Sequence, residues 1–97
     1  MMRYVALLNF TDQGLRGINQ TIDRARAFRI TVGKYKASLK ELYWTSGQYD
    51  LIAIIEVPDE ETGMALLLSL SVLGNVRSQT LRAFSSQEME AILNKMP

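Results

Sequence analysis

The sequence predicts an α+β fold in which helices cover one face of a four-stranded antiparallel sheet and a further helix ends the chain. The first observation is length, since 97 residues are enough for one domain with a single core. The second is that four apolar runs of strand length alternate with helical segments. The third is that the middle two runs are joined only by Ser46-Gly47-Gln48, which predicts a hairpin in which Gly47 takes a positive φ.

The four predicted strands are rich in β-branched, aromatic and aliphatic residues and are bounded by turn residues. They cover residues 3–10, 39–45, 49–57 and 76–84. Turn chemistry over residues 11–14 ends the first strand, and Pro58 ends the third. We therefore expect a sheet of four strands.

Three helices are predicted from apolar spacing and from residues that favour helix ends. Thr21 is the expected N-cap of a helix that runs to Lys36, and Asp59 is the expected N-cap of a helix over residues 60–73. Ser85 and Glu88 have the spacing of a capping box and open a C-terminal helix that extends to about residue 96. The resulting order is the split β-α-β pattern of the ferredoxin-like fold, with strand order 4-1-3-2.

Composition excludes several classes of function. Eleven Lys and Arg against ten Asp and Glu give a net charge of +1, which argues against a nucleic-acid partner. The chain has no Cys and no His, so thiol chemistry, Ser-His-Asp catalysis and imidazole metal sites are excluded. We expect no cofactor and no metal. The longest apolar segment of the second half covers residues 64–73, too short for a bilayer, so we expect a cytoplasmic protein without a membrane partner.

Both faces of the predicted sheet are apolar at their centre. In the first strand Val5 and Leu7 lie between Arg3 and Asn9, and in the third strand Ile52 and Ile54 lie between Asp50 and Glu56. An antiparallel sheet with one wet face should instead alternate apolar and polar residues. We therefore expect a homodimer, or a higher homo-oligomer, that packs sheet against sheet. The alternative is that the C-terminal helix folds back over this face of its own subunit.

Two stretches resemble the signatures of the GYD domain family. They are Thr45-Ser46-Gly47-Gln48-Tyr49-Asp50 and the block from Gly74-Asn75-Val76-Arg77 to Phe84, and the opening residues 4–14 are similar to the start of that family. The resemblance implies that residues 1–97 form a single ferredoxin-like domain of the dimeric α/β-barrel superfamily. It implies little about activity.

The predicted topology brings six candidate ligand-binding residues to one edge of the sheet. They are Asn9, Trp44, Thr45, Tyr49, Asp50 and Arg77. A few polar groups at the rim of an apolar cavity are typical of a small-molecule site. Each also has a structural interpretation: Asp50 can accept backbone hydrogen bonds or pair with Arg77, Tyr49 can lie in the core, and Trp44 can anchor an interface. At the opposite edge, Arg3 and Glu56 are expected to form an ion pair.

Two functions remain open at this point. The first is a homo-oligomeric module that binds a small organic molecule or supports assembly without chemistry. The second is a cofactor-free enzyme, monooxygenase-like or isomerase-like, acting in a cavity at the sheet face. In that enzyme Asp50 would be the candidate catalytic base, while Tyr49 or Arg77 would stabilise negative charge.

Overall fold

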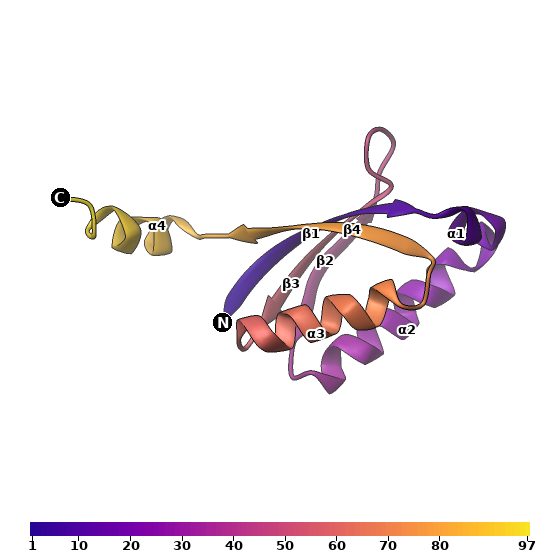
Figure 1. The fold of residues 1–97 in the computed structure, drawn as a ribbon, viewed down its shortest axis with the longest axis horizontal. Helices are drawn as coiled ribbons and strands as arrows, with labels where there is room; N and C mark the ends of the chain where they lie inside the picture. Colours follow the sequence, from indigo (N-terminus) through magenta and orange to yellow (C-terminus); the bar gives the residue numbers. More distant parts are fainter.

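The computed structural model describes residues 1–97 and contains one four-stranded sheet flanked by helices (Figure 1). The strands are β1 (Met2–Phe10), β2 (Ser38–Trp44), β3 (Leu51–Val57) and β4 (Val76–Ala83). The helices are α1 (Asp12–Arg16), the 3₁₀-helix η1 (Ile18–Gln20), α2 (Thr21–Lys34), α3 (Glu60–Ser71) and α4 (Ser86–Leu93). The predicted α+β class is confirmed, and each predicted strand is present with slightly different ends.

The sheet has the predicted strand order, β2-β3-β1-β4, and all its neighbouring strands are antiparallel. In the register of β1, Ala6 lies opposite Ala53 of β3, and Asn9 lies opposite Arg77 of β4. Helices α2 and α3 lie on one face of the sheet (Figure 1). We call the other face, which no helix covers, the open face. It carries Val5, Leu7, Ile52 and Ile54.

The core lies between the sheet and the two helices. Its fully buried members are Ala6, Leu8, Val32, Leu39, Leu51, Ala53, Ile55, Val57 and Leu66. Along β3 buried side chains alternate with half-buried ones, so successive residues point to the core and to the open face. The apolar pattern predicted for both faces of this strand is therefore confirmed.

Between β1 and α2 the chain forms two short helices where the sequence indicated only a turn. Thr11 caps α1, since its side-chain oxygen accepts from the Gly14 backbone N–H at 3.1 Å, and the same hydroxyl donates to the Gly74 carbonyl at 2.5 Å. Gly14 is buried, and a Cβ atom at that position would overlap the carbonyl oxygen of Asn75. The helical conformation thus depends on docking against a segment sixty residues away, which local turn chemistry does not reveal.

The predicted start of α2 is wrong. Gln20 is the N-cap and makes no side-chain capping bond, while Thr21 is the first helical residue. The hydroxyl oxygen of Thr21 instead accepts from the indole N–H of Trp44 at 2.9 Å. The helix ends at Lys34 rather than Lys36, because Lys36 has a φ of 57°, which is incompatible with the helix.

The later helices begin where the sequence predicts. Asp59 caps α3 by accepting from the Thr62 backbone N–H at 2.8 Å, and Ser85 and Glu88 form a complete capping box on α4. Both helices end before the predicted residues 73 and 96. Gly74, with a φ of 82°, reverses the chain after α3.

The chain beyond β4 extends away from the sheet (Figure 1). We call residues 84–97, which include α4, the arm. Its projection makes the molecule 52 Å long, against 30 and 19 Å in the other two directions. The alternative in which the C-terminal helix folds back over the sheet is therefore wrong, and the open face is exposed in a single chain.

None of the helices combines the length and the apolarity needed to cross a bilayer.

Candidate ligand pocket and open sheet face

A pocket of about 160 Å³ lies between the sheet and helices α2 and α3. Ten of the fifteen residues that line it are hydrophobic, which makes its surface predominantly apolar. The lining residues are Leu8, Phe10, Thr21, Arg24, Ala25, Ala27, Phe28, Thr31, Leu42, Leu51, Ser69, Leu70, Leu73, Asn75 and Val76. A cavity of about 150 Å³ is large enough to bind benzene. The pocket can therefore hold a small apolar molecule.

Polar side chains around the pocket are mostly engaged within the chain. Arg24 donates to the carbonyls of Gly14 and Gly17, at 3.3 and 2.5 Å. Ser69 donates to the Leu66 carbonyl at 2.6 Å. No group of three acidic side chains is arranged to hold a metal ion. The pocket therefore offers a ligand mainly apolar contacts.

At one end of the sheet, hydrogen bonds made by Asp50 fix the last residues of β1. Its Oδ2 atom accepts from the Phe10 backbone N–H at 2.9 Å, and its own N–H donates to the Leu8 carbonyl at 2.8 Å. Its carbonyl accepts from the Thr45 N–H, also at 2.8 Å. The carboxylate thus takes the place of a backbone acceptor, and no ion pair joins it to Arg77.

Asn9 and Thr45 fix the loop between β2 and β3. The side-chain amide of Asn9 donates to the Gln48 carbonyl at 2.9 Å, and the Thr45 hydroxyl donates to the Tyr49 carbonyl at 2.6 Å. Gly47 has the predicted positive φ, 140°. The predicted gathering of Asn9, Thr45 and Asp50 is therefore confirmed, with each side chain bound to backbone.

The remaining candidates separate onto the two faces. The Tyr49 hydroxyl donates to Gln79 at 2.7 Å, and Gln79 lies opposite Leu7 on the open face. The interpretation of Tyr49 as a core residue is therefore wrong. Trp44 reaches the other way, to α2, and remains 44% exposed. Arg77 is exposed and pairs with no carboxylate of its own chain.

None of the six candidate residues lines the pocket. Sequence reasoning missed the pocket because it lies on the helix-covered face, where we expected only core. A signal is present in α2, whose half-buried residues at the pocket include Ala25 and Thr31. These side chains are too small to fill the space that Leu would fill, but a helical pattern alone does not show that the facing residues leave it empty.

The open face has an apolar centre that runs across all four strands. Val5, Leu7, Ile52 and Ile54 are only half-buried in the single chain. Toward the sheet edges, Tyr43 is 53% and Leu81 is 48% exposed. Such a surface, with charged groups at its rim, is typical of a face that meets a partner.

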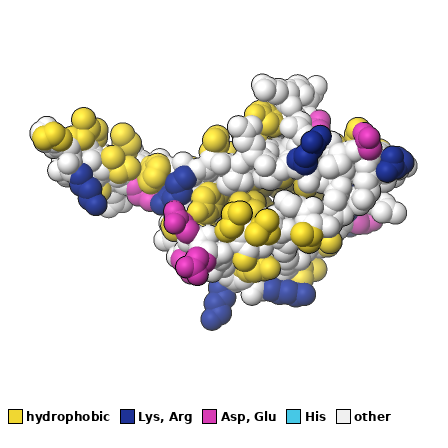
Figure 2. Space-filling model, viewed as in Figure 1, with side chains coloured by type: hydrophobic (Ala, Val, Ile, Leu, Met, Phe, Trp, Pro, Cys, Tyr) yellow, Lys and Arg dark blue, Asp and Glu magenta, His cyan; other side chains and the backbone are white.

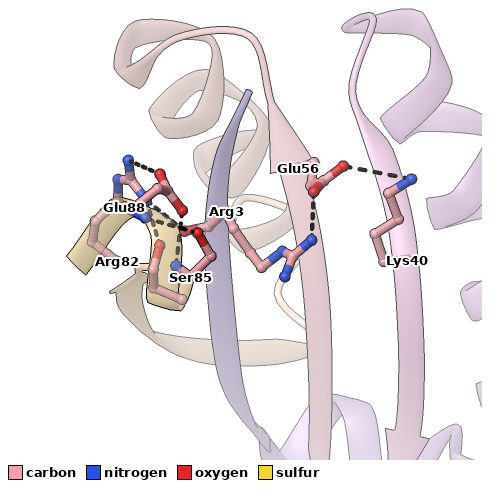
Figure 3. A network of polar contacts seen from close by, with 7 residues as sticks. Arg3, Lys40, Glu56, Arg82, Ser85 and Glu88 are labelled. Atoms are coloured by element: carbon pink, nitrogen blue, oxygen red, sulfur yellow. Dashed lines mark hydrogen bonds and ion pairs between the residues drawn. The ribbon is translucent and has the colours of Figure 1, made fainter. Parts of the chain in front are cut away.

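One rim of the open face is an ion-pair network (Figure 3). Arg3 contacts Glu56 at 2.7 Å, as predicted, and Lys40 approaches the other oxygen of Glu56 at 3.4 Å. The hydrogen bond from Arg3, supported by Lys40, holds the pKa of the Glu56 carboxyl below its ordinary value. Farther along the same end of the sheet, Arg82 lies 3.7 Å from Glu88 of α4. This end of the sheet is therefore charged on both sides of β1, with Arg3 on the open face and Arg82 on the helix-covered face.

Comparison with solved structures shows the class to which this fold belongs. The crystal structure of TTHA0845 from Thermus thermophilus superposes with a TM-score of 0.58 and 23% sequence identity, covering 88% of this chain and 95% of that chain. The chain thus has a ferredoxin-like α+β fold. The family model of the GYD domain matches residues 4–93, so the chain belongs to the GYD domain family, as its motifs indicated. No curated protein matches it.

Proposed function

We propose that this chain is a homodimeric module that binds a small, largely apolar organic molecule. The observation that carries the binding function is the pocket of about 160 Å³ between the sheet and helices α2 and α3. Most of its polar neighbours are engaged with the chain itself, which favours an uncharged ligand. The ligand would contact Phe28 and Thr31 from α2 and Leu70 from α3.

The open face supports the homodimer. Its four central aliphatic side chains remain half-exposed, and fully burying one such side chain contributes about 1.5–3 kcal/mol. Two sheets can pack face to face about 10 Å apart with their side chains interdigitated. Because α4 projects away from this face, no element of the chain competes for it.

The enzyme alternative finds no support at its candidate base. The carboxylate of Asp50 is bound to the Phe10 N–H, and Asp50 does not line the pocket. We therefore propose binding without assigning a reaction, and we propose a structural role for Asp50.

Solution mass tests the homodimer. We expect sedimentation at micromolar concentration to give twice the chain mass of 11.0 kDa for the wild type and the chain mass for Ile54→Lys. Ile54 lies at the centre of the open face, where the substitution would place a charge between the sheets. The control is Ile30→Lys on α2, because Ile30 is 65% exposed and lies away from the open face. A monomeric wild type would contradict the dimer.

Benzene is a suitable probe of the pocket. We expect added benzene to shift backbone amide NMR signals around Phe28 and Leu70, because both residues line the cavity. Ala25→Leu should fill the space and abolish the shifts. Ala65→Leu adds the same volume on an exposed part of α3 outside the pocket and should preserve them. Identical shifts in the two variants would show that benzene binds elsewhere.

A further inference from the structure

We propose that the arm packs its apolar stripe on a second copy of this chain, beside the sheet-to-sheet contact. The proposal rests on the proposed homodimer and adds a second part to its interface. It assigns a partner to a segment whose helix buries none of its residues against the body of the chain.

The arm carries an apolar stripe that is spaced for one face of a helix. Its members are Met89, Ile92, Leu93 and Met96, which are 44%, 37%, 51% and 65% exposed. The positions i, i+3, i+4 and i+7 fall on one side of a helical turn. Hydrophobic side chains are visible along the arm (Figure 2). The stripe is therefore an apolar helix face without a partner in its own chain.

The helix in the arm is well started but too short to be stable alone. Ser85 and Glu88 complete a capping box, which satisfies backbone donors at its first turn. Yet α4 has only eight residues, and isolated helices shorter than about 12–15 residues are marginal in water. Most helical stability in proteins comes from packing an apolar face. Since the chain offers α4 no such packing, the partner must come from outside it.

Contacts at the base of the arm set its direction. The guanidinium carbon of Arg82 lies 4.4 Å from the centre of the Phe84 ring, and another part of the same group lies 3.7 Å from Glu88. Arg82 also donates to the Arg3 carbonyl at 3.4 Å, which ties this point to β1 (Figure 3). The arm is thus braced in an extended position instead of folded onto its own sheet.

The open face indicates that the partner is a second copy. Leu81 on that face is 48% exposed, and Phe84, which lies at the base of the arm on the side of Arg82, is 51% exposed, so apolar side chains are exposed on both sides of β4 where the arm begins. Four strands of seven to nine residues span a projected area of only about 500 Å². A stable interface buries roughly 800 Å² of accessible surface on each partner. The arm adds apolar area to this small contact, and a two-fold axis lets each copy receive the arm of the other.

Crosslinking between isotopically distinct chains tests where the arm lies. The chain has no Cys, so Met89→Cys provides one attachment point for a photoreactive maleimide. Unlabelled and ¹⁵N-labelled protein are mixed, dissociated, reassociated and irradiated, and crosslinked peptides are analysed by mass spectrometry. We expect crosslinks that join a light peptide to a heavy one. Crosslinks confined to chains of one label, or no crosslinks at all, would overturn the proposal.

The contribution of the stripe to affinity provides a second measurement. We expect Ile92→Glu to raise the dimer dissociation constant about tenfold or more, because it places a charge in the buried stripe. Ala91→Glu adds the same charge on the opposite side of α4 and should change the constant less than about threefold. Equal effects of the two variants would contradict the proposal. A dimeric wild type with an unaffected constant would remove the arm contact alone, whereas a monomeric wild type would remove the proposed function as well.

Discussion

The carboxylate of Asp50 joins β3 to β1 at the end of the sheet where the regular ladder between them stops. The Phe10 N–H that it accepts is part-buried and would otherwise lack a partner in the chain. Leaving such a donor unsatisfied costs about 1–3 kcal/mol. The family motif therefore has a structural role here. Asp50 completes the hydrogen bonding between β3 and β1, and Gly47 allows the turn that precedes β3.

We predict that Asp50→Ala lowers the free energy of unfolding by about 1–3 kcal/mol, because it removes the acceptor for the Phe10 N–H. Asp50→Asn retains a carbonyl oxygen of similar position and should cost about 1 kcal/mol or less. Urea unfolding monitored by Trp fluorescence measures both values, since the chain has one Trp. If both variants match the wild type within about 0.5 kcal/mol, this hydrogen bond does not stabilise the fold.

A second prediction at the residue scale concerns Gly47. With a φ of 140°, a β-branched residue there is strained even though no atom lies within 4 Å of the added Cβ. We expect Gly47→Val to cost about 1–3 kcal/mol in the same unfolding measurement. The matched control is Gly33→Ala in α2, where space is also open and Ala should stabilise the helix by about 0.5–1 kcal/mol. An unchanged stability of Gly47→Val would show that the turn tolerates other conformations.

At the scale of the element, α2 depends on its arginines more than its pattern suggests. Arg24 holds the α1–η1 connection, and Arg29 donates to the Leu39 carbonyl of β2 at 3.1 Å. Val32 is the only buried residue of this helix. Hydrogen bonds from two Arg residues therefore supplement a small apolar contact, and the same weak apolar contact leaves room for the pocket.

Helix capping at α3 gives a prediction about pH. The hydrogen bond from the Thr62 backbone N–H holds the pKa of the Asp59 carboxyl below its ordinary value of 3.8. The folded pKa lies below the unfolded one, so the stabilisation is complete above the unfolded value and is lost as the pH falls through the folded value.

We therefore expect the melting temperature of the wild type to fall between about pH 5 and pH 2.5 by more than that of Asp59→Asn. Asn is a comparable N-cap but does not titrate, so it retains the hydrogen bond at both ends of this range. Differential scanning calorimetry across the range measures the difference. Parallel pH profiles for the two proteins would mean that ionisation of Asp59 does not stabilise α3.

At the scale of the whole molecule, the core on one side of the sheet is thin, and the open face carries further apolar side chains that are only half-buried. Only nine hydrophobic residues are fully buried. If two open faces pack together, folding and association share the same apolar contacts. The stability of each chain then depends on its partner.

We predict that the wild-type melting temperature rises as the protein concentration rises from about 1 to 100 μM, because association favours the folded state by mass action. Ile54→Lys should melt at a lower temperature that does not depend on concentration. Circular dichroism at several path lengths measures both. A wild-type melting temperature that is constant over this range would contradict a dimer that contributes to stability.

The sequence by itself determined the helices and strands and their order, because these depend on local interactions. The caps at Asp59 and at Ser85–Glu88, the turn at Gly47 and the alternation along β3 each depend on residues within a few positions of one another. The order of these elements, together with their lengths, restricts the topology to the ferredoxin-like sheet. The two apolar faces were likewise visible, because a strand sends alternate residues to opposite sides.

Only the tertiary structure decided which residues far apart in the sequence contact one another. Phe10 and Asp50 are 40 positions apart, and Thr21 and Trp44 are 23 apart, so neither hydrogen bond follows from spacing. The pocket exists because small residues of α2 face a sheet and a second helix that do not fill the gap, a property of three elements together. The arm has the pattern of an ordinary packed helix, and its sequence does not say on which body it packs. That depends on the direction in which Arg82 and the end of β4 send it.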